Sequence, residues 1–210
     1  AFLFEAEFNN DTLQGNFYSG NHWSCDWYAV KDDNFELRNP EELTHIKNNS
    51  VFTFSAIDSL GNTFSYPNED YKEKVTIIQI MGSWCPNCMD ETVFYKELYK
   101  DYNNQGLEII SVGFEAGKTN EIRQKQLARL KKHFDINYPV LLGGKADKKV
   151  ANEVFGSLNH VMSFPTSIFI DKEGKVRKIH TGFNGPSTGS YYTNYVEQTK
   201  MLIEELINEK

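Results

Sequence analysis

Hydrophobic residues follow two alternating periods from about residue 50 to the end of the chain. Apolar or alternating runs at 51–58, 74–82 and 107–114 are typical of strands, and the second run is β-branched and apolar almost throughout. Between these runs, apolar residues recur at three- and four-residue steps, which indicates amphipathic helices. This alternation predicts an α/β sheet in which 74–82 is the central, fully buried strand.

The first predicted helix starts at Pro86 and ends near the Asn-Asn-Gln-Gly sequence at 103–106, because proline suits a first turn and glycine ends a helix. Its predicted inner face contains Cys88, Glu91, Tyr95, Leu98 and Tyr102. The remaining predicted elements are a helix at 121–134, an extended piece at 138–144, a short helix at 147–156, a β-hairpin over 166–183 and a closing helix with an apolar face over 195–206.

The first 49 residues follow a different pattern. Residues 12–20 and 23–33 predict two strands, and 39–49 predict a short helical turn or loop. We therefore predict a β-rich extension over 1–49, such as the tail of an upstream domain, and one α/β domain over 50–210. The chain begins with Ala1 instead of Met, which we interpret as a processed product or a piece of a longer chain.

Composition narrows the classes of function. Hydrophobic residues make up 40% of the 210 residues and charged residues 24%, which is an ordinary globular composition. The formal net charge of −7 provides no basic stripe that would follow phosphates, so nucleic-acid binding is not expected. The longest apolar run, 75–81, is far shorter than the roughly 18 to 20 residues of a membrane span. No membrane span is expected in this chain.

Cys85 and Cys88 stand three positions apart between the buried strand and the first helix. Cys85 is expected at or near the helix N-cap, where free backbone N–H groups and the helix dipole favour a thiolate. We predict that Cys85 is the nucleophile. Cys88, one turn further along and more buried, is predicted to be the resolving thiol that attacks the mixed disulfide. Pro86 fixes the backbone between them at no cost in hydrogen bonding.

Glu91 shares the predicted helix face with Cys88. A half-buried carboxylate has a raised pKa, so Glu91 would accept the proton of Cys88 near neutral pH. The alternative is that Glu91 only interacts with the helix dipole, as we expect for Asp90.

Three segments in this order resemble the thioredoxin superfamily: WCPNCMDE at 84–91, SFPTSIFIDKEGKV at 163–176 and HTGF at 180–183. Within that superfamily the chain is most similar to the TlpA/ResA-like thiol-disulfide oxidoreductases of the bacterial cell envelope, over residues 50–210. The resemblance implies a thioredoxin-like three-layer α/β/α sandwich with a mixed central sheet. It also implies a location in the periplasm or cell envelope.

The resemblance further implies a redox centre at Cys85 and Cys88, assistance by Glu91, and a cis-proline at Pro165 opposite Cys85. A cis proline there would leave a backbone edge free to pair with an extended substrate. We assign substrate binding to Trp84, Pro86, Phe164 and Thr166, with the two aromatic residues forming an apolar rim.

The predicted activity is dithiol–disulfide exchange with protein or peptide disulfides, in the reducing direction. Electrons would come from an upstream thiol donor. No organic cofactor and no metal is expected, because the cysteine pair itself carries the electrons. The chain departs from thioredoxin at Gln79, where thioredoxin has a buried acid, and this departure gives Glu91 more weight.

Three alternatives compete with this prediction. A zinc site would join His22 and Cys25 to the cysteine pair. A peroxiredoxin-like thiol peroxidase would need a threonine three residues before the nucleophile, where this chain has Gly82. A redox-inert binding module of thioredoxin fold would use the cysteine pair as a staple, although so small a loop stabilises little. Cys25 is otherwise expected to be a small buried hydrophobe, and His160 and His180 to be packed or surface residues near the active-site end.

Overall fold

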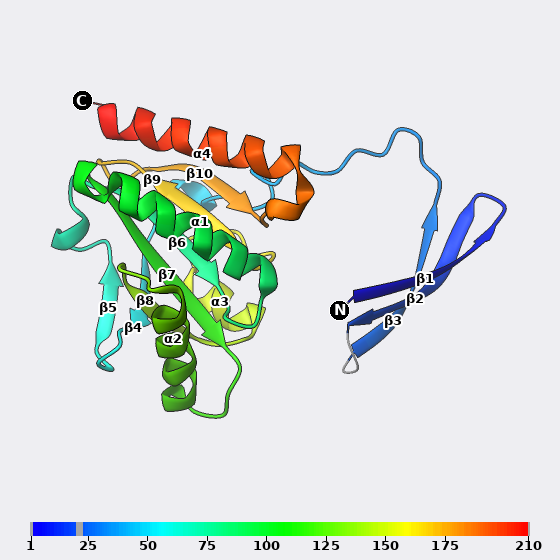
Figure 1. Ribbon diagram of the computed structural model, residues 1–210, viewed down its shortest axis with the longest axis horizontal. Coiled ribbons are helices and arrows are strands. Elements are labelled where there is room, and N and C mark those ends of the chain that lie inside the picture. Colours follow the sequence, from blue (N-terminus) through cyan, green and yellow to red (C-terminus); the bar gives the residue numbers. More distant parts are fainter. Residues whose placement is uncertain (1, 20–22, 210) are drawn as a thin grey trace. The chain divides into compact units, whose positions relative to one another are not determined.

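The computed structural model describes residues 2–19 and 23–209. The chain divides between Arg38 and Asn39 into two compact units. Figure 1 labels the elements of both units, which we describe separately.

The larger unit is built on a seven-stranded mixed sheet with the strand order β10-β9-β6-β7-β8-β4-β5. The three central strands β6, β7 and β8 are parallel, whereas β9 runs antiparallel to β6 and β10 antiparallel to β9. The strands are β4 (Phe54–Ile57), β5 (Thr63–Tyr66), β6 (Val75–Met81), β7 (Leu107–Glu115), β8 (Val140–Lys145), β9 (Thr166–Ile170) and β10 (Val176–Thr181). Every residue of β6 is buried, which confirms the predicted central strand.

Helices cover both faces of this sheet and complete three layers (Figure 1). The α-helices are α1 (Pro86–Tyr102), α2 (Asn120–Phe134), α3 (Lys148–Val154) and α4 (Ser190–Asn208), and short 3₁₀ turns occur at Lys47–Asn49, Glu69–Tyr71, Asn103–Gln105 and Pro186–Thr188. The predicted three-layer α/β/α sandwich with a mixed sheet is confirmed. None of the helices in the described part of the chain has the length and apolar character that a bilayer-crossing segment requires.

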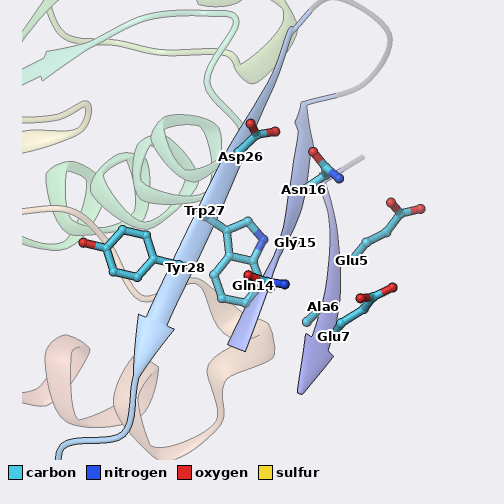
Figure 2. Close-up of a pocket in the computed structure, with 9 residues that line it drawn as sticks. All are labelled: Glu5, Ala6, Glu7, Gln14, Gly15, Asn16, Asp26, Trp27 and Tyr28. Carbon is cyan, nitrogen blue, oxygen red and sulfur yellow. The ribbon is translucent and has the colours of Figure 1, made fainter. Parts of the chain in front are cut away.

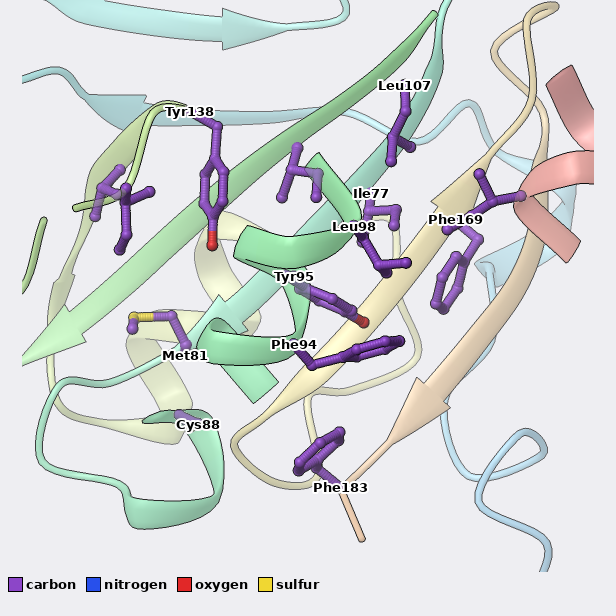
Figure 3. Packing of buried hydrophobic residues seen from close by; sticks show 14 of the residues in the cluster. Ile77, Met81, Cys88, Phe94, Tyr95, Leu98, Leu107, Tyr138, Phe169 and Phe183 are labelled. Carbon is purple, nitrogen blue, oxygen red and sulfur yellow. The ribbon is translucent and has the colours of Figure 1, made fainter. Parts of the chain in front are cut away.

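The alternation of side chains along the central strands separates two hydrophobic cores. Ile77 and Ile109 face the layer of α1, α2 and α4, whereas Ile78 and Ile110 face α3 and β4. Figure 3 shows the first core, where Tyr95 and Leu98 of α1 lie against the strands. Because α1 is anchored by these buried side chains, its N-terminus is held at the end of β6.

Residues 39–49 are joined to the larger unit by hydrogen bonds. The Lys47 N–H donates to Ser157 O at 2.8 Å, and the Thr44 and Thr181 hydroxyls lie 3.0 Å apart in a buried position. The two units therefore meet at residues 38 and 39, whereas the sequence predicts a boundary after residue 49. The reason is that these polar residues find their partners far away in the sequence.

The smaller unit is a three-stranded antiparallel sheet of β1 (Phe2–Asn9), β2 (Thr12–Ser19) and β3 (Trp23–Val30). Aromatic residues gather on one face, where the rings of Phe4 and Phe17 lie 4.6 Å apart. Figure 2 shows a hollow on this sheet lined by Glu5, Ala6, Glu7, Gln14, Gly15, Asn16, Asp26, Trp27 and Tyr28. The β-rich extension is confirmed, but β1 was not predicted, and neither was β5 of the larger unit.

Removing the smaller unit tests the domain division. A chain of residues 39–210 is expected to unfold cooperatively with nearly the free energy of unfolding that the larger unit has in the full chain. A chain of 50–210 loses several buried or partly buried hydrogen bonds, each contributing about 1 kcal/mol, so it is expected to be less stable by roughly 2–4 kcal/mol. Urea unfolding followed by far-UV circular dichroism measures the difference. Equal stability of the two chains would contradict the division at residue 38.

Candidate active site

Cys85 is the N-cap residue of α1, and Pro86 occupies the first helical position. The Cys85 N–H donates to Gly82 O at 3.0 Å, which forms a turn between the end of β6 and the helix. Only 8% of the Cys85 surface is exposed, and Cys88 is fully buried in the core beneath α1. Figure 3 includes Cys88 among the residues of that core. No disulfide joins the two residues in the structure.

The environment of Cys85 favours its thiolate. A hydrogen bond from the Cys88 thiol lowers the pKa of Cys85 to about 7, with smaller contributions from the backbone N–H groups of Cys88 and Asn87, and despite the opposing effect of burial. The backbone donors are the free N–H groups of the first helical turn. The largest contribution to the lowered pKa of Cys85 comes from the Cys88 thiol. The position of Cys85 at the helix N-terminus does not by itself account for this contribution.

The environment of Cys88 has the opposite effect. Burial raises the pKa of Cys88 far above its ordinary value, and the neighbouring Cys85 and Glu91 raise it further. Of the two thiols, Cys88 therefore keeps its proton more strongly and Cys85 loses its proton more readily. The two thiols of one motif have clearly different acidities, because one lies at the helix end and the other lies inside the core.

Phe164 and Pro165 lie opposite Cys85. The peptide bond between them is cis, which is the isomer that the resemblance implies. The Cys85 Sγ donates to Phe164 O at 3.5 Å, so these two separate motifs meet at the nucleophile. Pro165 is buried immediately before β9.

The residues assigned to substrate binding have different exposures. Trp84 is 51% exposed, Pro86 is exposed, and Phe164 is half-buried. The rings of Trp84 and Phe164 meet edge to face with centroids 5.7 Å apart, so they form one apolar surface beside Cys85. Thr166, by contrast, is buried, and its hydroxyl donates to Ser163 O at 2.9 Å. Its side chain is thus engaged inside the protein, which differs from the expected substrate contact.

Glu91 is completely buried and is held by donors from three elements. Gln79 Nε2 of β6 donates to Glu91 Oε2 at 3.0 Å, while Ser167 Oγ of β9 and the Tyr195 hydroxyl of α4 donate to Oε1 at 3.0 and 3.4 Å. Burial raises the pKa of Glu91 to about 7, although these hydrogen bonds oppose the shift. The carboxylate is therefore poised to gain or lose a proton near neutral pH.

Gln79 replaces the acid of thioredoxin and takes part in the same network. The Ser111 hydroxyl donates to Gln79 Oε1 at 2.6 Å, which orients the amide so that its NH₂ group faces Glu91. Thr92 Oγ1 donates to Cys88 O at 2.8 Å and lies 3.3 Å from the same Gln79 oxygen. Gln79 thus connects Glu91 to the strand beneath the helix. Gln79, where thioredoxin has an acid, therefore provides an N–H donor for the Glu91 carboxylate.

Several residues of the site were missed by the sequence reasoning. Ser167 and Tyr195 contact Glu91 directly, and Ser83 and Glu115 contact each other beside Cys85. None has a motif of its own. The one available signal was the place of Ser167 two residues after Pro165, on the strand that the resemblance puts next to the cysteine pair.

Two histidines and the third cysteine were weaker candidates for the site. His180 is buried, and its ring centroid lies 4.7 Å from that of Tyr195. Burial lowers the pKa of His180 to about 4. His160 is partly exposed. Cys25 is also partly exposed, which corrects the expectation of a buried residue, because its small sheet has no second layer within its own unit.

The zinc alternative depends on His22, which lies outside the described residues. Among residues 2–19 and 23–209, no group of three or more His, Cys, Asp and Glu side chains is arranged to hold a metal ion.

The sequence matches a family model and is similar to proteins that are named thiol-disulfide oxidoreductases. Residues 47–195 match the family model Redoxin. The chain is 32% identical over 113 residues to the thiol-disulfide oxidoreductase ResA of Geobacillus thermodenitrificans, covering 54% of this chain and 58% of the relative. It is also 32% identical over 141 residues to ResA of Bacillus thuringiensis, covering 66% of this chain and 65% of the relative. The chain thus spans less than two thirds of these relatives' lengths.

Among solved structures, a thiol:disulfide interchange protein of the thioredoxin family from Chlorobium tepidum superposes with a TM-score of 0.55. The sequence identity is 18%, and the superposition covers 83% of this chain and all of the other. At this identity the similarity supports the fold.

The buried carboxylate predicts a specific dependence of stability on pH. The pKa of Glu91 is raised from 4.5 to about 7 on folding, so between these values the native state binds more protons than the unfolded state. Stability is therefore expected to fall as pH rises from 4.5 to 7, with a contribution from Glu91 of about 3 kcal/mol. Glu91→Gln is expected to remove this part of the slope.

Urea unfolding at a series of pH values between 4.5 and 8 gives the free energy of unfolding of each protein. The contribution of Glu91 is the difference between the pH dependence of the wild type and that of the Glu91→Gln variant. Asp90→Asn is the matched control, because Asp90 is exposed on the same helix turn. An unchanged slope in the Glu91→Gln variant would mean that Glu91 is ionised throughout this range.

Proposed function

Because the chain belongs to the Redoxin family, we propose that it exchanges the Cys85/Cys88 dithiol with disulfides of proteins or peptides, acting as a thiol-disulfide oxidoreductase. One observation carries this proposal: Cys85 is the N-cap residue of α1 and has a lowered pKa, while the second thiol, Cys88, is buried one turn further along the helix. This arrangement provides a nucleophile and a resolving group within one helical turn.

In the first step the Cys85 thiolate attacks one sulfur of the substrate disulfide. A bond forms between Cys85 and that sulfur, the substrate disulfide bond breaks, and the other substrate sulfur leaves as a thiolate that takes up a proton. Since the pKa of Cys85 is about 7, a large fraction of the thiol is ionised at neutral pH.

In the second step Cys88 loses its proton and attacks Cys85. The intramolecular disulfide forms, the mixed disulfide breaks, and the second substrate thiolate is released. Two electrons have then passed from the cysteine pair to the substrate. We propose that Glu91 accepts the Cys88 proton, because its pKa of about 7 makes it a proton acceptor at neutral pH. An upstream thiol donor restores the dithiol.

We propose that an extended substrate lies along the backbone at Phe164 and Pro165, with Trp84, Pro86 and Phe164 contacting its side chains. The exposure of Trp84 and Pro86, and the partial exposure of Phe164, support this role. Thr166 is proposed to act indirectly, since its hydrogen bond to Ser163 O closes the segment that contains Pro165.

The reducing direction is supported by the acidity of the nucleophile. The pKa of Cys85 is about 7, which matches the nucleophilic cysteine of thioredoxin. The corresponding cysteine of a strongly oxidising pair has a pKa of about 3.5. A measured reduction potential near that of an oxidant, about −120 mV, would reverse this direction. The resemblance to envelope oxidoreductases leads us to propose an extracytoplasmic location, in the periplasm or cell envelope.

A thiol peroxidase is the main alternative, and the position of Gly82 argues against it. A Cβ atom at residue 82 would lie 2.5 Å from Trp84 Nε1, so a threonine there would displace the indole. Peroxide turnover with a thiol donor that greatly exceeds disulfide turnover would favour the peroxidase instead.

Trapping of a mixed disulfide tests the proposed function. Cys88→Ala removes the resolving thiol, so a disulfide-bonded peptide added to this reduced variant is expected to accumulate as an adduct on Cys85. Non-reducing mass spectrometry detects the adduct and maps it. The Cys85→Ala variant is the matched control and is expected to form at most a trace of adduct, because Cys88 is buried. An inert binding module would give no adduct with either variant.

A further inference from the structure

Glu115, at the last position of β7, is a buried carboxylate outside the chemistry described above. Only 1% of its surface is exposed. Its Oε1 accepts the Ser83 N–H at 2.6 Å, and its Oε2 accepts the Ser83 hydroxyl at 2.5 Å. Both carboxylate oxygens thus bind one residue, two positions before Cys85. Burying a carboxylate is costly unless donors satisfy it, so the pair holds Ser83 firmly.

The neighbouring residues make a parallel contact. Trp84 Nε1 donates to Phe114 O at 2.8 Å. The consecutive residues 114 and 115 at the end of β7 therefore bind the consecutive residues 83 and 84. The indole also lies over Gly82, where a side chain would collide with it. The Trp84 ring is thereby fixed on one side while about half of its surface remains exposed.

The fixed indole forms one wall of a continuous aromatic surface. The ring of Phe164 contacts that of Trp84 edge to face at 5.7 Å and stacks on that of Phe114 at the same centroid distance. Phe164 O is in turn 3.5 Å from Cys85 Sγ. An apolar side chain placed on this surface would lie beside the nucleophile.

We propose that Glu115 is a positioning residue that holds Trp84 in place through Ser83, so that Trp84 and Phe164 bind an apolar side chain next to the reacting half-cystine of the substrate. This inference rests on the proposed function and adds a substrate class to it: extended peptides with an aromatic or large aliphatic residue beside the disulfide. A surface aromatic that is already ordered loses little conformational entropy on binding, which favours recognition.

The test compares two substitutions of one residue. Glu115→Leu removes both acceptors. Glu115→Gln retains an acceptor for the Ser83 N–H, and its NH₂ group is able to donate to the Ser83 hydroxyl oxygen. Ser83→Ala removes the hydroxyl contact from the other side and serves as a second disrupting variant. Glu121→Leu is the matched control, because Glu121 is exposed in the first turn of α2.

Three disulfides are reduced by each variant: a peptide disulfide flanked by Leu, the same peptide flanked by Ser, and the small non-aromatic disulfide of 2-mercaptoethanol. Glu115→Leu is expected to lose about fivefold in preference for the Leu-flanked peptide, through KM, while its rate with the disulfide of 2-mercaptoethanol stays within about twofold. Glu115→Gln and Glu121→Leu are expected to keep the wild-type preference. Ser83→Ala is expected to fall between them.

A second readout follows Trp84 directly. The chain has three tryptophans, and in a variant with Trp23→Phe and Trp27→Phe only Trp84 remains. Quenching of its fluorescence by acrylamide then reports how mobile and accessible the Trp84 ring is. Quenching is expected to rise in Glu115→Leu and to stay unchanged in Glu115→Gln.

The outcomes separate cleanly. An unchanged peptide preference in Glu115→Leu, with unchanged quenching, would overturn the inference. Equal losses in Glu115→Gln and Glu115→Leu would also overturn it, because they would assign the effect to the charge. If the wild-type protein reduced none of the three disulfides, the proposed function would fail, whereas the quenching data would still test how Trp84 is held.

Discussion

The proximity of two cysteines at the start of α1, with Cys85 at the helix N-cap and Cys88 buried one turn further along, is the constraint on which the rest of the site depends. It lowers the pKa of Cys85 and raises that of Cys88, so the two thiols differ clearly in acidity. The contact requires a fixed distance between a helix end and the helix interior. The buried side of α1, packed on the central strands, fixes that distance.

Under the mechanism that we propose, burial of Cys88 creates a second requirement, since a thiol inside the core needs a proton acceptor that is also inside the core. Glu91 meets it with a carboxylate that is fully buried but surrounded by three donors from β6, β9 and α4. The network brings the sheet and the C-terminal helix into contact with the helix that carries the cysteines. The same residues that stabilise the core thus adjust the proton affinity of the site.

The sequence was most informative where chemistry is local. The spacing of Cys85 and Cys88, the proline between them, and the apolar run before them were enough to predict the strand and the start of the helix. The partners of Glu91 were not predicted, because Ser167 and Tyr195 lie 76 and 104 positions away, and their approach depends on how strands and helices pack. Strand β1 could have been predicted, because Phe4, Ala6 and Phe8 alternate with Glu5 and Glu7, which is the period of two that is typical of a strand.

The difference in acidity between the two cysteines is tested most directly by alkylation of the reduced wild-type protein with iodoacetamide, with peptide mapping by mass spectrometry at a series of pH values. The account predicts that Cys85 reacts with a midpoint near pH 7 and that Cys88 remains unmodified over the same range. A midpoint for Cys85 at or above its ordinary pKa of 9.0, or modification of Cys88 as fast as that of Cys85, would contradict it.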